Sequence, residues 1–167
     1  MARGQESQFP INPLEYLRRD HSVLSDVFAI GRSDPVFQAG TSERVTAHGV
    51  SGLFFPSLGV QALMGRTIGP DDDRVGAGNR VAVISHAFWS RQFGRDPSNL
   101  GASVRLSGQR FTVDGIMPPE FCGIDRAAVP DLWVPLAADP NPGEVWVLGR
   151  LRPGVSVARG TDTGAAE

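Results

Sequence analysis

The sequence predicts a soluble domain of the α+β class. The chain has 167 residues, about the length of one domain, and 41% of them are hydrophobic while 20% are charged, a balance that permits a packed core. Some segments space their apolar residues as helices do, and others alternate as strands do. The 20 glycines and 13 prolines predict many loops between short elements.

The charge balance argues against two classes of ligand. All 16 basic side chains are arginines, and 18 acidic side chains bring the formal net charge to −2. A nucleic-acid-binding domain is expected to carry a basic excess, which is missing. The Walker phosphate-binding motif needs a lysine, and the chain has none. We therefore expect no nucleic acid partner and no direct nucleotide binding.

The N-terminal third is expected to begin with helices and continue with strands. Asn followed by Pro at 12–13 predicts a helix over 13–20. The helical spacing of apolar residues predicts a second short turn over 23–28. From 34 to 50 scattered apolar residues lie among Thr, Ser and Gly, which predicts two strands joined at 39–41.

A helical turn and a strand followed by a helix are expected next. The segment 53–59 predicts one or two helical turns that end at Gly59. The apolar run over 80–84 is typical of a buried strand. Ser85 is a good N-cap for a helix over 86–93, which is expected to end at Gly94.

A hairpin and two further strands complete the predicted elements. A two-residue turn at 108–109 would place the apolar pairs on one face and the polar pairs on the other. The expected pairs are Ser107 with Arg110, Leu106 with Phe111, Arg105 with Thr112 and Val104 with Val113. The segment 131–136 predicts a short edge strand limited by proline, and 144–151 alternates like another strand.

The acidic and histidine side chains do not predict a metal site. Asp71, Asp72 and Asp73 lack the alternate spacing and the later bidentate acid of a calcium loop, so a solvated acidic turn is expected. The histidines, at 21, 48 and 86, are too dispersed for a zinc motif. We expect no metal-binding residues.

Serine, glycine and cysteine patterns do not predict a catalytic or cofactor site either. Ser51 lacks the second glycine of a nucleophile elbow. Ser85 stands next to His86, and adjacent side chains at a helix start diverge, so capping explains it better. The segment 76–78 lacks the third glycine of a dinucleotide fingerprint and precedes a strand. Cys122 has no nearby base and is expected to be a small buried residue.

The start of the chain predicts no export signal, because residues 1–8 lack the apolar run of a secretory signal. The longest stretch without a charged side chain, 45–65, is interrupted by polar residues and glycines. We therefore expect neither a signal peptide nor a transmembrane helix in this chain.

Four segments of the chain, taken together and in order, resemble a known family. They are GVSGLFFPSLGVQALMGRTIGPDDD (49–73), RVAVISHAFWSRQFGRDPSNLGASVRLSGQRFTVDGIMPPEF (80–121), DLWVPL (131–136) and LGRLRPGVSVA (148–158). The chain is similar to the MacB-like periplasmic core domain of ABC transporter permeases with an FtsX-like permease region. The resemblance covers about residues 10–158 and is strongest over 50–136.

The resemblance implies a fold of two small mixed lobes, one split in sequence around the other. The first lobe would comprise about 10–48 and 137–158, and the second about 49–136. Residues 1–9 and 159–167 are expected to be disordered, since they lack apolar periodicity.

The resemblance also implies a function and a location. In this family the core domain lies on the extracytoplasmic, periplasmic side of the bacterial cytoplasmic membrane. It transmits movement of the transmembrane helices to a partner or substrate there, and it is not an enzyme. The implied partners are the permease transmembrane region, a separate ATPase subunit and an extracytoplasmic protein, with no cofactor. A free-standing secreted hydrolase or binding protein is the alternative, and loss of activity on Ser51→Ala or Ser85→Ala would identify the hydrolase.

Overall fold

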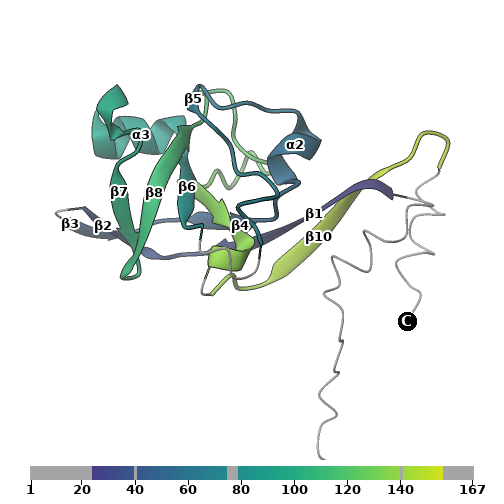
Figure 1. Cartoon of the computed structure of the whole chain (residues 1–167), viewed down its shortest axis with the longest axis horizontal. Helices are drawn as coiled ribbons and strands as arrows, with labels where there is room; N and C mark the ends of the chain where they lie inside the picture. Colours follow the sequence, from purple (N-terminus) through teal and green to yellow (C-terminus); the bar gives the residue numbers. More distant parts are fainter. Residues whose placement is uncertain (1–23, 40, 75–78, 140, 156–167) are drawn as a thin grey trace, which may run out of the picture. The chain divides into compact units, whose positions relative to one another are not determined.

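The structure is a computed structural model that describes residues 24–39, 41–74, 79–139 and 141–155 (Figure 1). The described residues are mainly strands with a few short helices, which confirms the mixed α and β content. The helix predicted over 13–20 and the disordered ends predicted at 1–9 and 159–167 lie outside the described residues.

The chain divides into two compact units, 1–27 with 147–167 and 28–146. In the first unit, the start of β1 (Leu24–Ser33) pairs with β10 (Val145–Leu151). The second unit carries the remaining helices and strands described below. These boundaries differ from those of the lobes expected from the family resemblance, and that two-lobe division stays a prediction.

The strands of the second unit form one mixed sheet. Their order is β1-β4-β9-β6-β8-β7-β2-β3, with the pairs β4/β9 and β6/β8 parallel and β5 paired with β8. The strand bounds are Val36–Ala39 (β2), Thr41–Arg44 (β3), Ala47–Val50 (β4), Met64–Gly65 (β5), Val81–Ile84 (β6), Ser103–Leu106 (β7), Gln109–Ile116 (β8) and Leu132–Pro135 (β9). The two strands predicted to meet at 39–41 are confirmed as β2 and β3, but the range 34–50 also contains a third strand, β4, that was not predicted. The strands predicted at 80–84 and 144–151 are β6 and β10.

Two predictions about strands are wrong. The turn predicted over 23–28 is part of β1, where Phe28, Ala29 and Ile30 are all buried. A continuous apolar run of this kind fits a strand buried on both faces as well as a helix. The edge strand predicted over 131–136 is a central one, because β9 pairs with β4 on one side and with β6 on the other. Proline is tolerated there because Pro135 is the last residue of β9.

Both helices predicted with glycine ends are confirmed. Helix α2 (Phe54–Leu58) ends at Gly59, and α3 (His86–Phe93) ends at Gly94, each glycine having a positive φ. The Phe88 N–H donates to Ser85 Oγ at 3.1 Å, which is the N-cap bond expected of this serine.

The helices cover opposite faces of the sheet (Figure 1). Side chains alternate along β9, so Leu132 and Val134 join Phe88 of α3 in one buried cluster while Trp133 points the other way. On that other face Phe55 of α2 packs edge to face against Trp133, with ring centroids 5.9 Å apart. Both faces of the central strands are therefore buried.

The hairpin forms, but with a register that differs from the prediction. Its turn is Ser107–Gly108, and the observed pairs are Leu106 with Gln109, Arg105 with Arg110, Val104 with Phe111 and Ser103 with Thr112. Both turn residues have positive φ, +47° and +82°, as a type I′ turn requires. The turn lies one residue earlier than predicted, which changes each strand partner by two positions. The apolar side chains of both strands still share one face, as predicted, and Leu106 and Phe111 are both buried.

A contact from outside the hairpin fixes this turn. The Ser107 N–H donates to the Val36 carbonyl at 2.8 Å, and the Val36 N–H donates to Ser107 Oγ at 3.1 Å. A non-glycine residue in the left-handed region is uncommon. The contact with β2, 71 residues away in sequence, stabilises it there.

Candidate functional site

The acidic turn is solvated only in part: Asp71 is exposed as predicted, whereas Asp72 is buried, contrary to the prediction. Asp72 is 4% exposed, and its carboxylate accepts two hydrogen bonds from the Arg66 guanidinium at 2.7 and 2.9 Å. The Gly69 N–H donates to it at 2.9 Å. The hydrogen bonds from Arg66 are the largest cause that lowers the pKa of Asp72. Bidentate pairing allows a carboxylate to be buried, so Asp72 is a structural anchor.

The same turn connects three further parts of the second unit. Arg66 also bridges to Asp114 of β8 at 2.8 Å. Asp73 accepts hydrogen bonds from the N–H groups of Gly52 at 3.2 Å and Ala137 at 3.0 Å. Within the described ranges, the structure contains no group of three or more acidic, histidine or cysteine side chains that could hold a metal.

The serines weighed as nucleophiles are both buried and hydrogen-bonded to backbone. Ser51 is fully buried and its Oγ accepts from the Ala29 N–H at 2.9 Å. Ser85 is buried as the cap of α3. Cys122 is a free thiol that is only half-buried, whereas the sequence predicted a buried residue. The glycine segment 76–78 lies outside the described residues.

His48 is buried in the middle of the sheet. It lies opposite Arg32 on β1 and opposite Trp133 on β9. Its Nδ1 atom and the Trp133 Nε1 atom are buried without a hydrogen-bond partner in the part of the chain that the structure describes. Burial is the main cause that lowers the pKa of His48, Arg32 lowers it further, and Asp125 opposes them. His86 is half-buried against the Trp89 ring, and His21 lies outside the described residues.

Acid is expected to destabilise the domain through His48. Its folded pKa lies below the unfolded value of about 6.5, so the unfolded state binds more protons between these two values. The contribution of His48 to the free energy of unfolding is therefore fully present above the unfolded pKa. As the pH falls from the unfolded pKa to the folded pKa, that free energy decreases by about 1.4 kcal/mol for each pH unit. The measurement is urea unfolding from pH 7.5 to 5.

The control for this prediction is His48→Gln, which cannot titrate. Its stability is expected to change less over the same pH interval than that of the wild type, whatever its absolute stability. Parallel curves for the two proteins would show that His48 does not cause the acid sensitivity.

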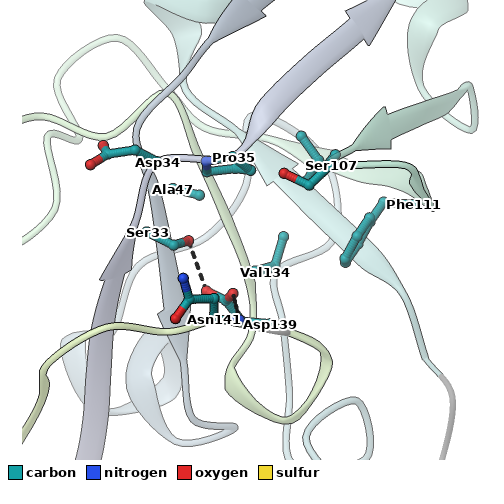
Figure 2. Close-up of a pocket in the computed structure, with 10 residues that line it drawn as sticks. Ser33, Asp34, Pro35, Ala47, Ser107, Phe111, Val134, Asp139 and Asn141 are labelled. Carbon is teal, nitrogen blue, oxygen red and sulfur yellow. Dashed lines mark hydrogen bonds between the residues drawn. The ribbon is translucent and has the colours of Figure 1, made fainter.

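A small pocket opens on the sheet face that carries α3 (Figure 2). Its volume is about 100 Å³, larger than the roughly 10–15 Å³ that one water needs and smaller than the 300 Å³ or more of drug-sized ligand sites. Apolar and polar side chains share the lining, which consists of Ser33, Asp34, Pro35, Ala47, Leu106, Ser107, Phe111, Val134, Asp139 and Asn141. Sequence reasoning missed this pocket because its residues come from five separate segments.

Two paired glycines leave room for the segment that carries Asp139 to lie against the strands beside this pocket. Gly31 of β1 lies opposite Gly49 of β4. A Cβ atom at Gly31 would lie 2.6 Å from the Pro142 carbonyl oxygen, and one at Gly49 would lie 3.1 Å from Asp139 Oδ2. Both positions therefore favour glycine, because the segment that carries Asp139 lies directly on the strands. Asp139 then accepts from Ser33 Oγ at 2.8 Å and from the Asn141 N–H at 3.1 Å.

Solved structures with this fold come from transporter proteins. One is the periplasmic region of MacB from Actinobacillus actinomycetemcomitans, with TM-score 0.69, 17% identity, and coverage of 89% of this chain and 67% of that one. Another is the extracellular domain of the noncanonic ABC-type transporter YknZ from Gram-positive bacteria. The TM-score is 0.65 and the identity 19%, and the match covers 87% of this chain and 73% of that one. A third is a domain of a protein assigned as a permease in Porphyromonas gingivalis. The TM-score is 0.60 and the identity 18%, and the match covers 86% of this chain and 62% of that one.

Sequence comparison gives the family itself. No curated protein matches this chain. No helix of the described residues is long and apolar enough to cross a membrane. The family model of the MacB-like periplasmic core domain matches residues 2–162. The chain therefore belongs to the MacB-like periplasmic core domain family.

Proposed function

We propose that this extracytoplasmic core domain transmits movement of the transmembrane helices of an ABC-type permease to a partner outside the membrane. The observation that carries the proposal is the family match over 2–162. The fold that the chain shares with the periplasmic region of MacB and the extracellular domain of YknZ supports it.

The packing of the second unit supports a mechanical role. To transmit a displacement, a domain must move as a body rather than deform, and close-packed cores have low compressibility. The sheet is buried on both faces at its centre, where the side chains of Val83, Val50 and Trp133 are all inaccessible to solvent. The contacts of Arg66 and Asp73 fasten the surface turn to this sheet.

We further propose that the domain itself is not catalytic and binds no nucleotide. The hydroxyl groups of Ser51 and Ser85 accept hydrogen bonds from backbone N–H groups and are buried, a poor arrangement for a nucleophile that must reach substrate. A separate ATPase subunit and the permease transmembrane region would then supply the energy and the movement. Tethering near the membrane raises the effective concentration of a partner, so intrinsic affinity for an extracytoplasmic protein can be weak.

Photocrosslinking in the complete transporter tests the partner contact. Photoreactive residues would replace the exposed apolar side chains Leu63, Ile124 and Val129 in turn. We expect crosslinks to an extracytoplasmic protein whose yield changes during ATP turnover. The matched control is the same transporter with an inactive ATPase subunit. The proposal would be contradicted if no protein crosslinks formed at any of the three positions. It would also be contradicted if the crosslinking yields were the same with and without ATP turnover.

A further inference from the structure

We propose that the pocket of Figure 2 binds a cationic group on a short apolar stem, an alkylammonium or alkylguanidinium ion. The inference does not rest on the transmission role, because binding can be measured on this chain alone. It rests on the charge, the lining and the construction of the pocket.

The charge inside the pocket comes from Asp139, whose carboxylate lies beside Ser33 and Asn141 (Figure 2). Asp139 is half-buried, and its hydrogen-bond donors in the described part of the chain, Ser33 Oγ and the Asn141 N–H, are neutral. An ionised carboxylate offers about four acceptor positions, so Asp139 retains capacity for a further donor. Within the part of the chain that the structure describes, Asp139 has no arginine or histidine ion-pair partner within 4.0 Å. Among the described residues, therefore, no cation pairs directly with its negative charge.

A second carboxylate, that of Asp34, is only weakly neutralised. The nearest Arg32 nitrogen lies 3.8 Å from Asp34 Oδ1, and the two side chains are 52% and 48% exposed. Ion pairs this exposed contribute little, because water screens them. The Asp34 carboxylate points away from the other lining residues (Figure 2), so it adds negative potential near the pocket while Asp139 supplies the direct contact.

The apolar lining selects the kind of cation. Ala47, Phe111 and Val134 supply hydrophobic surface in the same pocket, and such surface favours an alkyl stem over a fully hydrated ion. The described residues hold no group of three or more His, Cys, Asp or Glu side chains that could hold a metal ion. A volume of about 100 Å³ suits a single side chain or a small amine rather than a drug-sized molecule.

The pocket is built before any ligand arrives. The close approach of the Asp139 segment to Gly31 and Gly49 fixes one wall. The bonds between Ser107 and Val36 fix the hairpin turn that forms another. Preformed walls reduce the entropy lost on binding.

The same cationic chemistry can come from two sources, a free small amine or a basic side chain of a protein. NMR titration of the complete ¹⁵N-labelled chain distinguishes them. The probes are n-butylammonium, the lysine tripeptide acetyl-Gly-Lys-Gly-amide and, as the anionic control, butyrate. We expect saturable amide shifts at Ser33, Ala47 and Asn141 with n-butylammonium, at a Kd on the order of millimolar for so small a ligand.

The probes assign the source by their relative affinities. Binding of the peptide at least tenfold tighter than n-butylammonium would support the proposal with a protein side chain as the ligand. Equal or weaker peptide binding would support it with a free amine. No saturable shift with either cation, or equal shifts with butyrate, would overturn it.

Matched variants test the role of Asp139. Asp139→Asn keeps one carbonyl oxygen as acceptor and removes the charge, so we expect at least a fivefold weaker affinity for n-butylammonium in a chain with unchanged spectral dispersion. Asp71→Asn removes an exposed acid that pairs with Arg74 outside the pocket and serves as the control. Asp139→Ser, which also removes the charge, provides a second test should Asp139→Asn fail to fold. Wild-type affinity in both pocket variants would overturn the proposal.

Discussion

Leu106→Asp is expected to destabilise the domain by about 4 kcal/mol or more, since a carboxylate would enter the core without a partner. Leu106 is 4% exposed. It lies in the cluster that contains Phe37, Phe88 and Phe111. The charge would lie among apolar side chains that offer it no hydrogen-bond donor. Urea unfolding followed by tryptophan fluorescence measures the loss, and a protein that does not fold would be its extreme form.

The control for Leu106→Asp is Arg105→Asp in the same strand. Arg105 is exposed on the other face and lies opposite Arg110. The substitution replaces a like-charged pair with an oppositely charged one, so we expect a change within about 0.5 kcal/mol. Equal losses in the two variants would contradict the assignment of faces in this hairpin.

Arg66→Ala is expected to destabilise by about 3 kcal/mol, because it leaves the buried Asp72 carboxylate without its cation. Breaking an ion pair at a buried charge costs about 3–5 kcal/mol, and we take the lower end because the Arg66 side chain is 53% exposed. Thermal and urea unfolding at pH 7 measure the loss.

Arg74→Ala is the matched control, because Arg74 pairs with Asp71 of the same acidic turn at 2.8 Å but in full contact with solvent. We expect a loss of about 0.5 kcal/mol or less.

The pH dependence of stability gives a second check of the Arg66–Asp72 pair. The folded pKa of Asp72 is lowered, so its contribution is present above the unfolded pKa of about 3.9 and disappears as pH falls through the folded value. The difference in free energy of unfolding between wild type and Arg66→Ala should therefore become smaller in acid. A difference that stays constant down to pH 2 would contradict the role given to this ion pair.

The sequence predicted the helices and strands whose structural cause lies within a few neighbouring residues. Ser85 at an N-cap, Gly59 and Gly94 at helix ends, and the apolar run before Ser85 each carry their structural reason within a few residues. The mixed fold class and the family followed from such segments taken in order.

The features that the sequence could not predict depend on distant contacts. Asp72 is buried because Arg66 and the strands beside it enclose the turn, and no neighbouring residue indicates that. The register of the hairpin depends on Val36, and the central position of β9 depends on its parallel partner β4, 82 or more residues away. The pocket likewise exists only where the sheet assembles it, so a search for motifs along the chain cannot find it.

The central claim is that this domain moves as a body when the transporter turns over. Spin-label distance measurement in the complete transporter, with Cys122 replaced by serine, tests it most directly. One pair of labels joins exposed Arg105 to the permease transmembrane region, and a second pair joins Arg105 to Leu63 within the domain. We predict that ATP turnover changes the first distance and leaves the second unchanged. A constant first distance, or a change in the second as large as in the first, would contradict the claim.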